Sequence, residues 1–118
     1  MKSEAKGLNR LFHASKYSWQ GLMAGLKSEA ALRQEIAALA LLLPVIFWLD
    51  ISAAERSMLL LSTLLVLIVE LLNTAVETVV DRIGDDYHEL SGKAKDLASA
   101  AVLITLFGAG AIWLMILW

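Results

Sequence analysis

The chain has 118 residues, of which 58% are hydrophobic and only 19% are charged. Since about 25% of the residues of a soluble globular domain are charged, this composition excludes an ordinary soluble domain and predicts an integral membrane protein. The chain has no cysteine and a net charge of -2 without a basic run. Disulfides and thiolate metal sites are therefore excluded, and nothing indicates a nucleic-acid partner.

The amino-terminal residues 1–7 carry mixed charge and are not followed directly by a short apolar core, so they lack the pattern of a cleavable signal peptide. From about residue 8 to residue 27, apolar residues recur at helical spacing, with polar residues on the other side. This pattern predicts an amphipathic helix on the membrane surface. A soluble helix packed on a partner is the alternative, and Trp19 together with the lysines favours the membrane interface.

The first membrane span is predicted over about residues 29–49, with Ser28 as its capping residue. Its apolar core from Ile36 to Leu49 is shorter than the ~20 residues that a span needs, so the span must also include the turn at residues 30–32. Pro44 lies inside this span, which membrane helices tolerate when neighbouring groups satisfy the carbonyl that loses its donor.

The second span is predicted from about residue 53 to residue 83, because Ser52 and Glu55 have the spacing of a capping box and Gly84 is a suitable terminating residue. At ~1.5 Å per residue this helix is longer than the ~30 Å hydrocarbon core, so its carboxyl-terminal part projects into water. Four polar residues share one face of that part, within an arc of roughly 80°: Glu70, Asn73, Glu77 and Asp81.

The third span is predicted over about residues 91–118, opened by the polar segment 91–96. Its small residues allow other helices to approach closely, and Trp113 and Trp118 mark the outer membrane interface. The predicted fold is an all-α membrane protein, in which residues 1–118 form a single membrane domain with one amino-terminal amphipathic surface helix and three transmembrane helices.

The cationic residues predict the orientation of the chain. Most of them precede the first span or lie between the second and third spans, whereas only Arg56 lies in the first loop. Because cytoplasmic loops carry the excess of lysine and arginine, the amino terminus and the second loop are predicted to be cytoplasmic and the carboxyl terminus to lie outside. The residues that carry this bias are Lys2, Lys6, Arg10, Lys16, Lys27, Arg33, Arg82, Lys93 and Lys95.

The acidic residues then gather at the cytoplasmic side. The four residues Glu70, Asn73, Glu77 and Asp81 form a polar stripe on the second span. Three other groups reach a similar depth: Glu29, Glu35, and the pair Lys95–Asp96 at the predicted start of the third span. Mg²⁺ prefers a few carboxylates plus phosphate oxygens and water, a helix amino terminus can receive phosphate, and a carboxylate can take a proton from an alcohol. These residues suit a lipid-directed phosphotransferase. A proton or cation pathway and a structural oligomer seam remain as alternatives, and neither a Walker A nor a kinase-type glycine motif is present.

Four motifs resemble the prokaryotic diacylglycerol kinase family of small three-span membrane enzymes. They are Tyr17-Ser18-Trp19-x-Gly21-Leu22, Glu29-Ala30-Ala31-x-Arg33-Gln34-Glu35, Glu70-x-x-Asn73-Thr74-Ala75-x-Glu77-x-x-x-Asp81 and Tyr87-His88-Glu89-Leu90-Ser91-Gly92-x-Ala94-Lys95-Asp96. The second motif is more similar to the Gram-negative branch, which acts on diacylglycerol, than to the Gram-positive branch, which acts on undecaprenol.

The resemblance implies a bacterial inner-membrane homotrimer that uses ATP and Mg²⁺ to convert diacylglycerol to phosphatidic acid, at sites built between neighbouring subunits. It implies that Glu70 is the general base, that Glu29 and Glu77 bind magnesium, and that Lys95 steadies the phosphates with Asp96 beside it. Asn73 and Asp81 would organise the site. The implied nucleotide-binding residues are Arg10, Tyr17, Glu29, Glu77, Asp86, Tyr87, His88, Lys95 and Asp96.

The implied lipid contacts come from the surface helix, from both ends of the first span, and from the third span. They are Arg10, Ala14, Ser15, Lys16, Tyr17, Ser18, Trp19, Met23, Ala24, Gly25, Leu26, Ala31, Leu32, Arg33, Gln34, Glu35, Trp48, Leu49, Asp50, Ile51, Arg56, Glu70, Ser99, Trp113, Leu114, Met115, Ile116, Leu117 and Trp118. Undecaprenol kinase and a non-enzymatic proton- or cation-conducting oligomer are the alternative functions.

Overall fold

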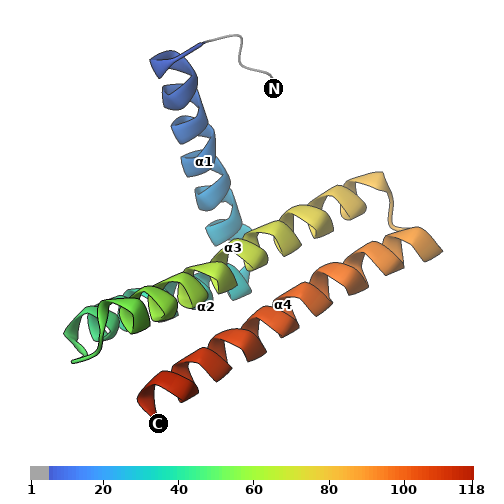
Figure 1. Ribbon diagram of the computed structural model, residues 1–118. Helices are drawn as coiled ribbons and strands as arrows, with labels where there is room; N and C mark the ends of the chain where they lie inside the picture. Colours follow the sequence, from blue (N-terminus) through green and yellow to red (C-terminus); the bar gives the residue numbers. More distant parts are fainter. Residues whose placement is uncertain (1–5) are drawn as a thin grey trace.

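The computed structural model describes residues 6–118, which form four helices in the order α1 (Leu8–Ser28), α2 (Ala30–Trp48), α3 (Ala53–Ile83) and α4 (Glu89–Leu117) (Figure 1). The predicted all-α class is confirmed for these residues. Two of the predictions concern residues 1–5, which lie outside the described range: the lack of a signal-peptide pattern at the amino terminus, and the contribution of Lys2 to the charge bias.

Three of the helices, α2, α3 and α4, are long and apolar enough to cross a membrane. Their positions agree with the three predicted spans. α3 packs against both of the others, along α4 over most of its length and along α2 over its first half (Figure 1). α1 contacts α2 near the corner between them, and its first half projects away from the three apolar helices (Figure 1).

The interior that these helices enclose is small. Leu32, Ile46 and Leu59 are the only large side chains among the described residues that are less than 2% exposed, and α4 contributes no buried residue at all. Many large apolar side chains of α2, α3 and α4 are exposed instead. A surface of this kind is stable in lipid, which solvates apolar side chains as well as a protein interior does.

The corner between α1 and α2 consists of the single extended residue Glu29. Ser28 was predicted to cap the first span, and this prediction is wrong. Ser28 is the last residue of α1, so it is itself helical and does not occupy the non-helical position of a cap. Arg33 closes the corner instead. Its guanidinium donates to the carbonyl oxygens of Leu26 at 2.8 Å and Lys27 at 3.3 Å, which satisfies carbonyls at the end of α1 that have no partner within the helix.

The connection between α2 and α3 contains the predicted capping box. The backbone nitrogen of Glu55 donates to the Ser52 hydroxyl, and the backbone nitrogen of Ser52 donates to the Glu55 carboxylate, both at 3.1 Å. Arg56 ties this start of α3 to the end of α2, since its guanidinium donates to the carbonyls of Ile46, Leu49 and Ile51.

The connection between α3 and α4 differs from the prediction at its second end. α3 ends at Ile83 with Gly84 as its terminating residue, as predicted, although Gly84 has φ 164°, an extended conformation that does not require glycine. α4 begins at Glu89 rather than at residue 91, because the Nδ1 atom of His88 accepts a 3.1 Å hydrogen bond from the Leu90 backbone and caps the helix. Lys95 and Asp96 therefore lie well inside α4, and the predicted position at a helix amino terminus is wrong.

Candidate functional site

The polar stripe of α3 lies on the face of the helix that packs against its neighbours. At about 100° per residue, Glu70 and Glu77 fall in the same arc as the buried residues Leu59, Thr63 and Val66. Glu70 is buried at 9% exposure, Asn73 and Glu77 are half-buried, and Asp81 is exposed. The stripe thus leads from the interior of the helical layer to its surface, as its order along the chain predicts.

Asn73 connects the middle of the stripe. Its Nδ2 atom donates a 3.2 Å hydrogen bond to Oε1 of Glu77, and its own amide oxygen is buried without a partner. Exchanging the oxygen and nitrogen of the Asn73 amide would bring its oxygen against the Glu77 carboxylate. This arrangement is excluded because both groups are then acceptors. The amide oxygen of Asn73 is therefore a buried acceptor without a hydrogen-bond partner among residues 6–118.

Lys95 pairs with the outer end of the stripe. Its ammonium group donates to Oδ1 of Asp81 at 2.9 Å, and both side chains are partly exposed. Lys95 precedes the apolar run of α4, which begins at Leu97. The side chain of Asp81 thus sets the position of Lys95 across the two helices.

Asp96 points to a different side of α4, because consecutive helical residues are about 100° apart. It lines a pocket together with Tyr87, Glu89, Gly92, Lys93 and Leu97. The structure thus brings together Tyr87 and Asp96, two of the residues implied for the nucleotide, in a pocket that Lys95 does not line. Asp86 and His88 are exposed in the adjoining connection.

Two further carboxylates come from the neighbourhood of α2. Glu35 is half-buried near the start of α2. Glu29 is half-buried at the corner with α1. No group of three or more aspartate, glutamate, histidine or cysteine residues able to hold a metal ion occurs within residues 6–118, so a single chain offers isolated carboxylates rather than a complete metal centre.

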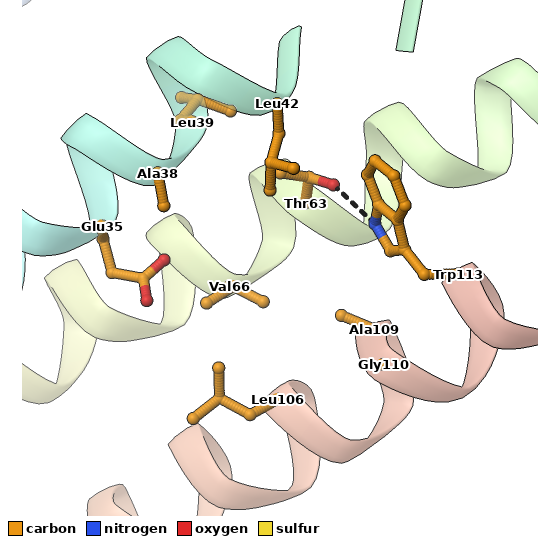
Figure 2. Close-up of a pocket in the computed structure, with 10 residues that line it drawn as sticks. All are labelled: Glu35, Ala38, Leu39, Leu42, Thr63, Val66, Leu106, Ala109, Gly110 and Trp113. Carbon is orange, nitrogen blue, oxygen red and sulfur yellow. Dashed lines mark hydrogen bonds between the residues drawn. The ribbon is translucent and has the colours of Figure 1, made fainter. Parts of the chain in front are cut away.

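A cavity of about 260 Å³ lies between α2, α3 and α4, next to the Glu35 end of this group (Figure 2). Its lining is apolar apart from Glu35 at one end and the pair Thr63 and Trp113 at the other (Figure 2). The indole nitrogen of Trp113 donates to the Thr63 hydroxyl at 3.1 Å. The remaining lining residues are Ala38, Leu39, Leu42, Val66, Leu106, Ala109 and Gly110.

The other predicted site residues are spread over the molecule. Arg10 and Tyr17 are exposed on α1, whose first half lies away from α3 within the chain (Figure 1). The lipid contacts implied near residues 31–35 lie at the start of α2, whereas those at residues 48–51 and 113–118 lie at the opposite end of the layer (Figure 1). Arg56, also implied for the lipid, uses its guanidinium on three backbone carbonyls.

Sequence comparison identifies related proteins along the whole chain. Residues 16–117 match the family model described as prokaryotic diacylglycerol kinase. A diacylglycerol kinase of Escherichia coli (strain K12) is 50% identical over 118 residues, covering 100% of this chain and 97% of the relative. Diacylglycerol kinases of Haemophilus influenzae and Pseudomonas aeruginosa are 49% and 44% identical, over 91% and 94% of this chain and 91% and 90% of their own lengths.

Proposed function

The chain belongs to the prokaryotic diacylglycerol kinase family, and from this membership we propose that it transfers the γ-phosphate of ATP to the free hydroxyl of diacylglycerol, giving phosphatidic acid. The observation that carries the proposal is the course of the stripe on α3. A buried carboxylate at Glu70 faces the apolar layer, and Asn73, Glu77 and the Asp81–Lys95 pair lead from it to the surface. A lipid alcohol and a water-soluble nucleotide can meet along such a stripe.

Glu70 acts as the general base in this proposal. Its carboxylate accepts the proton of the lipid hydroxyl as the hydroxyl oxygen forms a bond to the γ-phosphorus, and the bond from that phosphorus to the β-phosphate oxygen breaks to release ADP. Burial of Glu70 supports this role, since the base must reach an alcohol that stays in the membrane. Lys95 lies on the α4 side of the stripe, where its charge can hold the phosphates.

The chain carries oxygen ligands of the type that magnesium prefers, although residues 6–118 of one chain do not gather them into a complete metal centre. Mg²⁺ binds through one or two carboxylates while phosphates and water fill its remaining positions, and Glu29 and Glu77 are carboxylates of this kind. The amide oxygen of Asn73, which is buried without a partner among the described residues, lies on the same side chain that bonds to Glu77. When bound, magnesium would supply positive charge that offsets the charge developing on the phosphates. Glu77 would hold it through its carboxylate, and Asn73 would orient that carboxylate through the hydrogen bond to Oε1.

The proposal includes a homotrimer with sites shared between subunits, embedded in the bacterial inner membrane with the amino terminus in the cytoplasm. Two observations support shared sites. α4 buries none of its residues within the chain, and Tyr87 and Asp96 line a pocket away from Lys95. α1, whose Leu8, Phe12 and Trp19 are exposed, lies on the membrane surface in this arrangement.

Purified protein in mixed micelles tests the proposal directly. It is expected to transfer label from γ-labelled ATP to diacylglycerol, to require Mg²⁺, and to prefer diacylglycerol when undecaprenol competes in the same micelles. Preferred labelling of undecaprenol would assign the protein to that substrate instead. Ion flux through reconstituted vesicles without ATP consumption, and with no lipid labelling, would refute the kinase function.

A further inference from the structure

The corner between α1 and α2 contains one of the two carboxylates proposed to hold magnesium. Glu29 is the only residue between these helices, and its backbone is extended, with φ -120° and ψ 115°. It occupies the cap position of α2, but its side chain makes no capping hydrogen bond to that helix. The cap leaves the Glu29 carboxylate unused, so the direction in which this carboxylate points follows from how the corner is built.

The backbone of Glu29 is held on both sides. Its N–H donates to the Gly25 carbonyl at 2.8 Å, and its own carbonyl accepts from the Arg33 N–H at 3.3 Å. The last turn of α1 thus fixes one side of Glu29, and the first turn of α2 fixes the other. A change in the angle between the two helices would therefore move the Cα–Cβ bond that carries the carboxylate.

Arg33 joins the two helix ends across this corner. It lies in the first turn of α2, and its Nη1 atom donates to the carbonyls of Leu26 at 2.8 Å and Lys27 at 3.3 Å in the last turn of α1. A cation at this place also complements the negative end of the α1 dipole. Both hydrogen bonds are exposed, so their loss should loosen the corner without unfolding the chain.

The direction of α1 depends mainly on this corner within one chain. α1 contacts α2 near the corner, and its first half projects away from the three apolar helices (Figure 1). The two helices approach closely at Gly25, where a Cβ atom would lie 2.6 Å from Cδ1 of Leu32. The packing at Gly25 and the hydrogen bonds of Arg33 together restrain the angle at which α1 leaves α2.

We propose that Arg33 is a positioning residue for Glu29: its guanidinium fixes the angle between α1 and α2, and this angle sets where the Glu29 carboxylate meets the metal. The inference rests on the proposed kinase function, in which Glu29 and Glu77 hold magnesium. It gives Arg33 a different task from the lipid contact that the family resemblance implies, because the guanidinium donates to backbone carbonyls of α1.

Distances between spin labels measure the corner directly. The chain has no cysteine, so Asn9→Cys on α1 and Leu41→Cys on α2, both at exposed positions, can carry the labels. The doubly labelled full-length chain is diluted with excess unlabelled chain, so that only distances within one subunit contribute. We expect a narrow distance distribution in the native background, a broadened one with Arg33→Gln, and an intermediate one with Arg33→Lys, which keeps the charge but loses the forked donor. An unchanged distribution in Arg33→Gln would overturn the proposal.

Metal affinity shows whether the corner acts on the site. Mn²⁺ binding in the presence of ATP should weaken about 10-fold or more in Arg33→Gln, with partial recovery in Arg33→Lys and an unchanged KM for diacylglycerol. The matched control Lys27→Gln removes an exposed cation from the same corner but keeps the carbonyl that Arg33 contacts, so its Mn²⁺ affinity should equal that of the native protein. Equal losses in Arg33→Gln and Lys27→Gln, or a raised KM for diacylglycerol at native Mn²⁺ affinity, would overturn the positioning role.

The two proposals fail in different ways. If the native protein labels no diacylglycerol, the kinase function is wrong, and the spin-label distances and Mn²⁺ affinities still test the role of Arg33. If the native protein is an active kinase but Arg33→Gln binds Mn²⁺ as tightly as the native protein, the positioning role is wrong and the function stands.

Discussion

The amide group of Asn73 holds the carboxylate of Glu77 through a 3.2 Å hydrogen bond, while the oxygen of the same amide is buried without a partner. Removing the side chain with Asn73→Ala frees Glu77 to adopt other rotamers and deletes the free oxygen. Since loss of a group that orients a metal ligand typically lowers metal affinity or activity about 10- to 100-fold, we expect the Mg²⁺ concentration for half-maximal activity to rise by about 10-fold or more.

The control for that change is Thr78→Ala on the same helix. Thr78 is exposed, and its hydroxyl only donates to the Thr74 carbonyl of its own helix, so the Mg²⁺ dependence of this variant should match that of the native protein. Mn²⁺ binding in the presence of ATP, followed by electron paramagnetic resonance, gives a readout independent of turnover. An unchanged metal affinity in Asn73→Ala would show that Glu77 does not depend on Asn73.

The Lys95–Asp81 pair predicts unequal effects of its two members. Lys95→Gln removes the positive charge proposed to hold the phosphates, so KM for ATP should rise and kcat should fall. Asp81→Asn keeps the positive charge of Lys95 and removes only the negative charge that pairs with it. Because exposed ion pairs contribute little to stability, the thermal unfolding midpoint of this variant should stay unchanged. Kinetics at varied ATP concentration distinguish the two variants, and equally severe kinetic defects would mean that Asp81 itself contacts the nucleotide or metal.

The corner between α1 and α2 depends on the absence of a side chain at Gly25. A Cβ atom at this position would lie 2.6 Å from Cδ1 of Leu32, and Leu32 is only 1% exposed, so it has little room to move. Gly25→Ala is expected to destabilise the folded protein by about 1–3 kcal/mol. Gly21→Ala, where no atom lies within 4 Å of the new Cβ, is the matched control, and equal denaturation midpoints in detergent would refute the predicted steric conflict.

Arg56 predicts a structural effect at the other end of the layer. Its guanidinium donates to three carbonyls around the α2–α3 connection, and a lysine cannot reproduce this forked geometry. Arg56→Lys should therefore lower the free energy of unfolding by about 2 kcal/mol, whereas Arg82→Lys in the exposed last turn of α3 should not. Chemical denaturation in detergent measures both, and a stable Arg56→Lys variant with an altered KM for lipid would instead favour the implied lipid contact.

The helices could be predicted because their signals are local. The capping box at Ser52 and Glu55 appears in the structure as predicted, and the apolar lengths identify the three long helices. Two helix boundaries were wrong for local reasons as well. Ser28 has a residue type that commonly caps helices but lies inside α1, and His88 caps α4 although histidine is not among the preferred capping residues.

The candidate site could be predicted only where its residues share one helix. The stripe on α3 follows from helical spacing, and the Asn73–Glu77 bond joins residues four apart, a spacing that places side chains together. The Lys95–Asp81 and Thr63–Trp113 bonds join different helices. Their formation depends on how α3 and α4 align along each other, which no local pattern specifies. Sequence reasoning placed Lys95 at the depth of the stripe but did not identify Asp81 as its partner, and it missed the Thr63–Trp113 bond and the cavity beside it.

The most direct test of the proposed function is the Glu70→Gln variant, which keeps the shape of the side chain and removes its capacity to accept a proton. Purified native and variant proteins are assayed side by side in mixed micelles for transfer of label from ATP to diacylglycerol, with ATP binding and thermal unfolding measured on the same preparations. We expect the variant to fold and to bind ATP as the native protein does while its labelling of diacylglycerol falls to background. Native-level labelling by Glu70→Gln would contradict the assignment of Glu70 as the base.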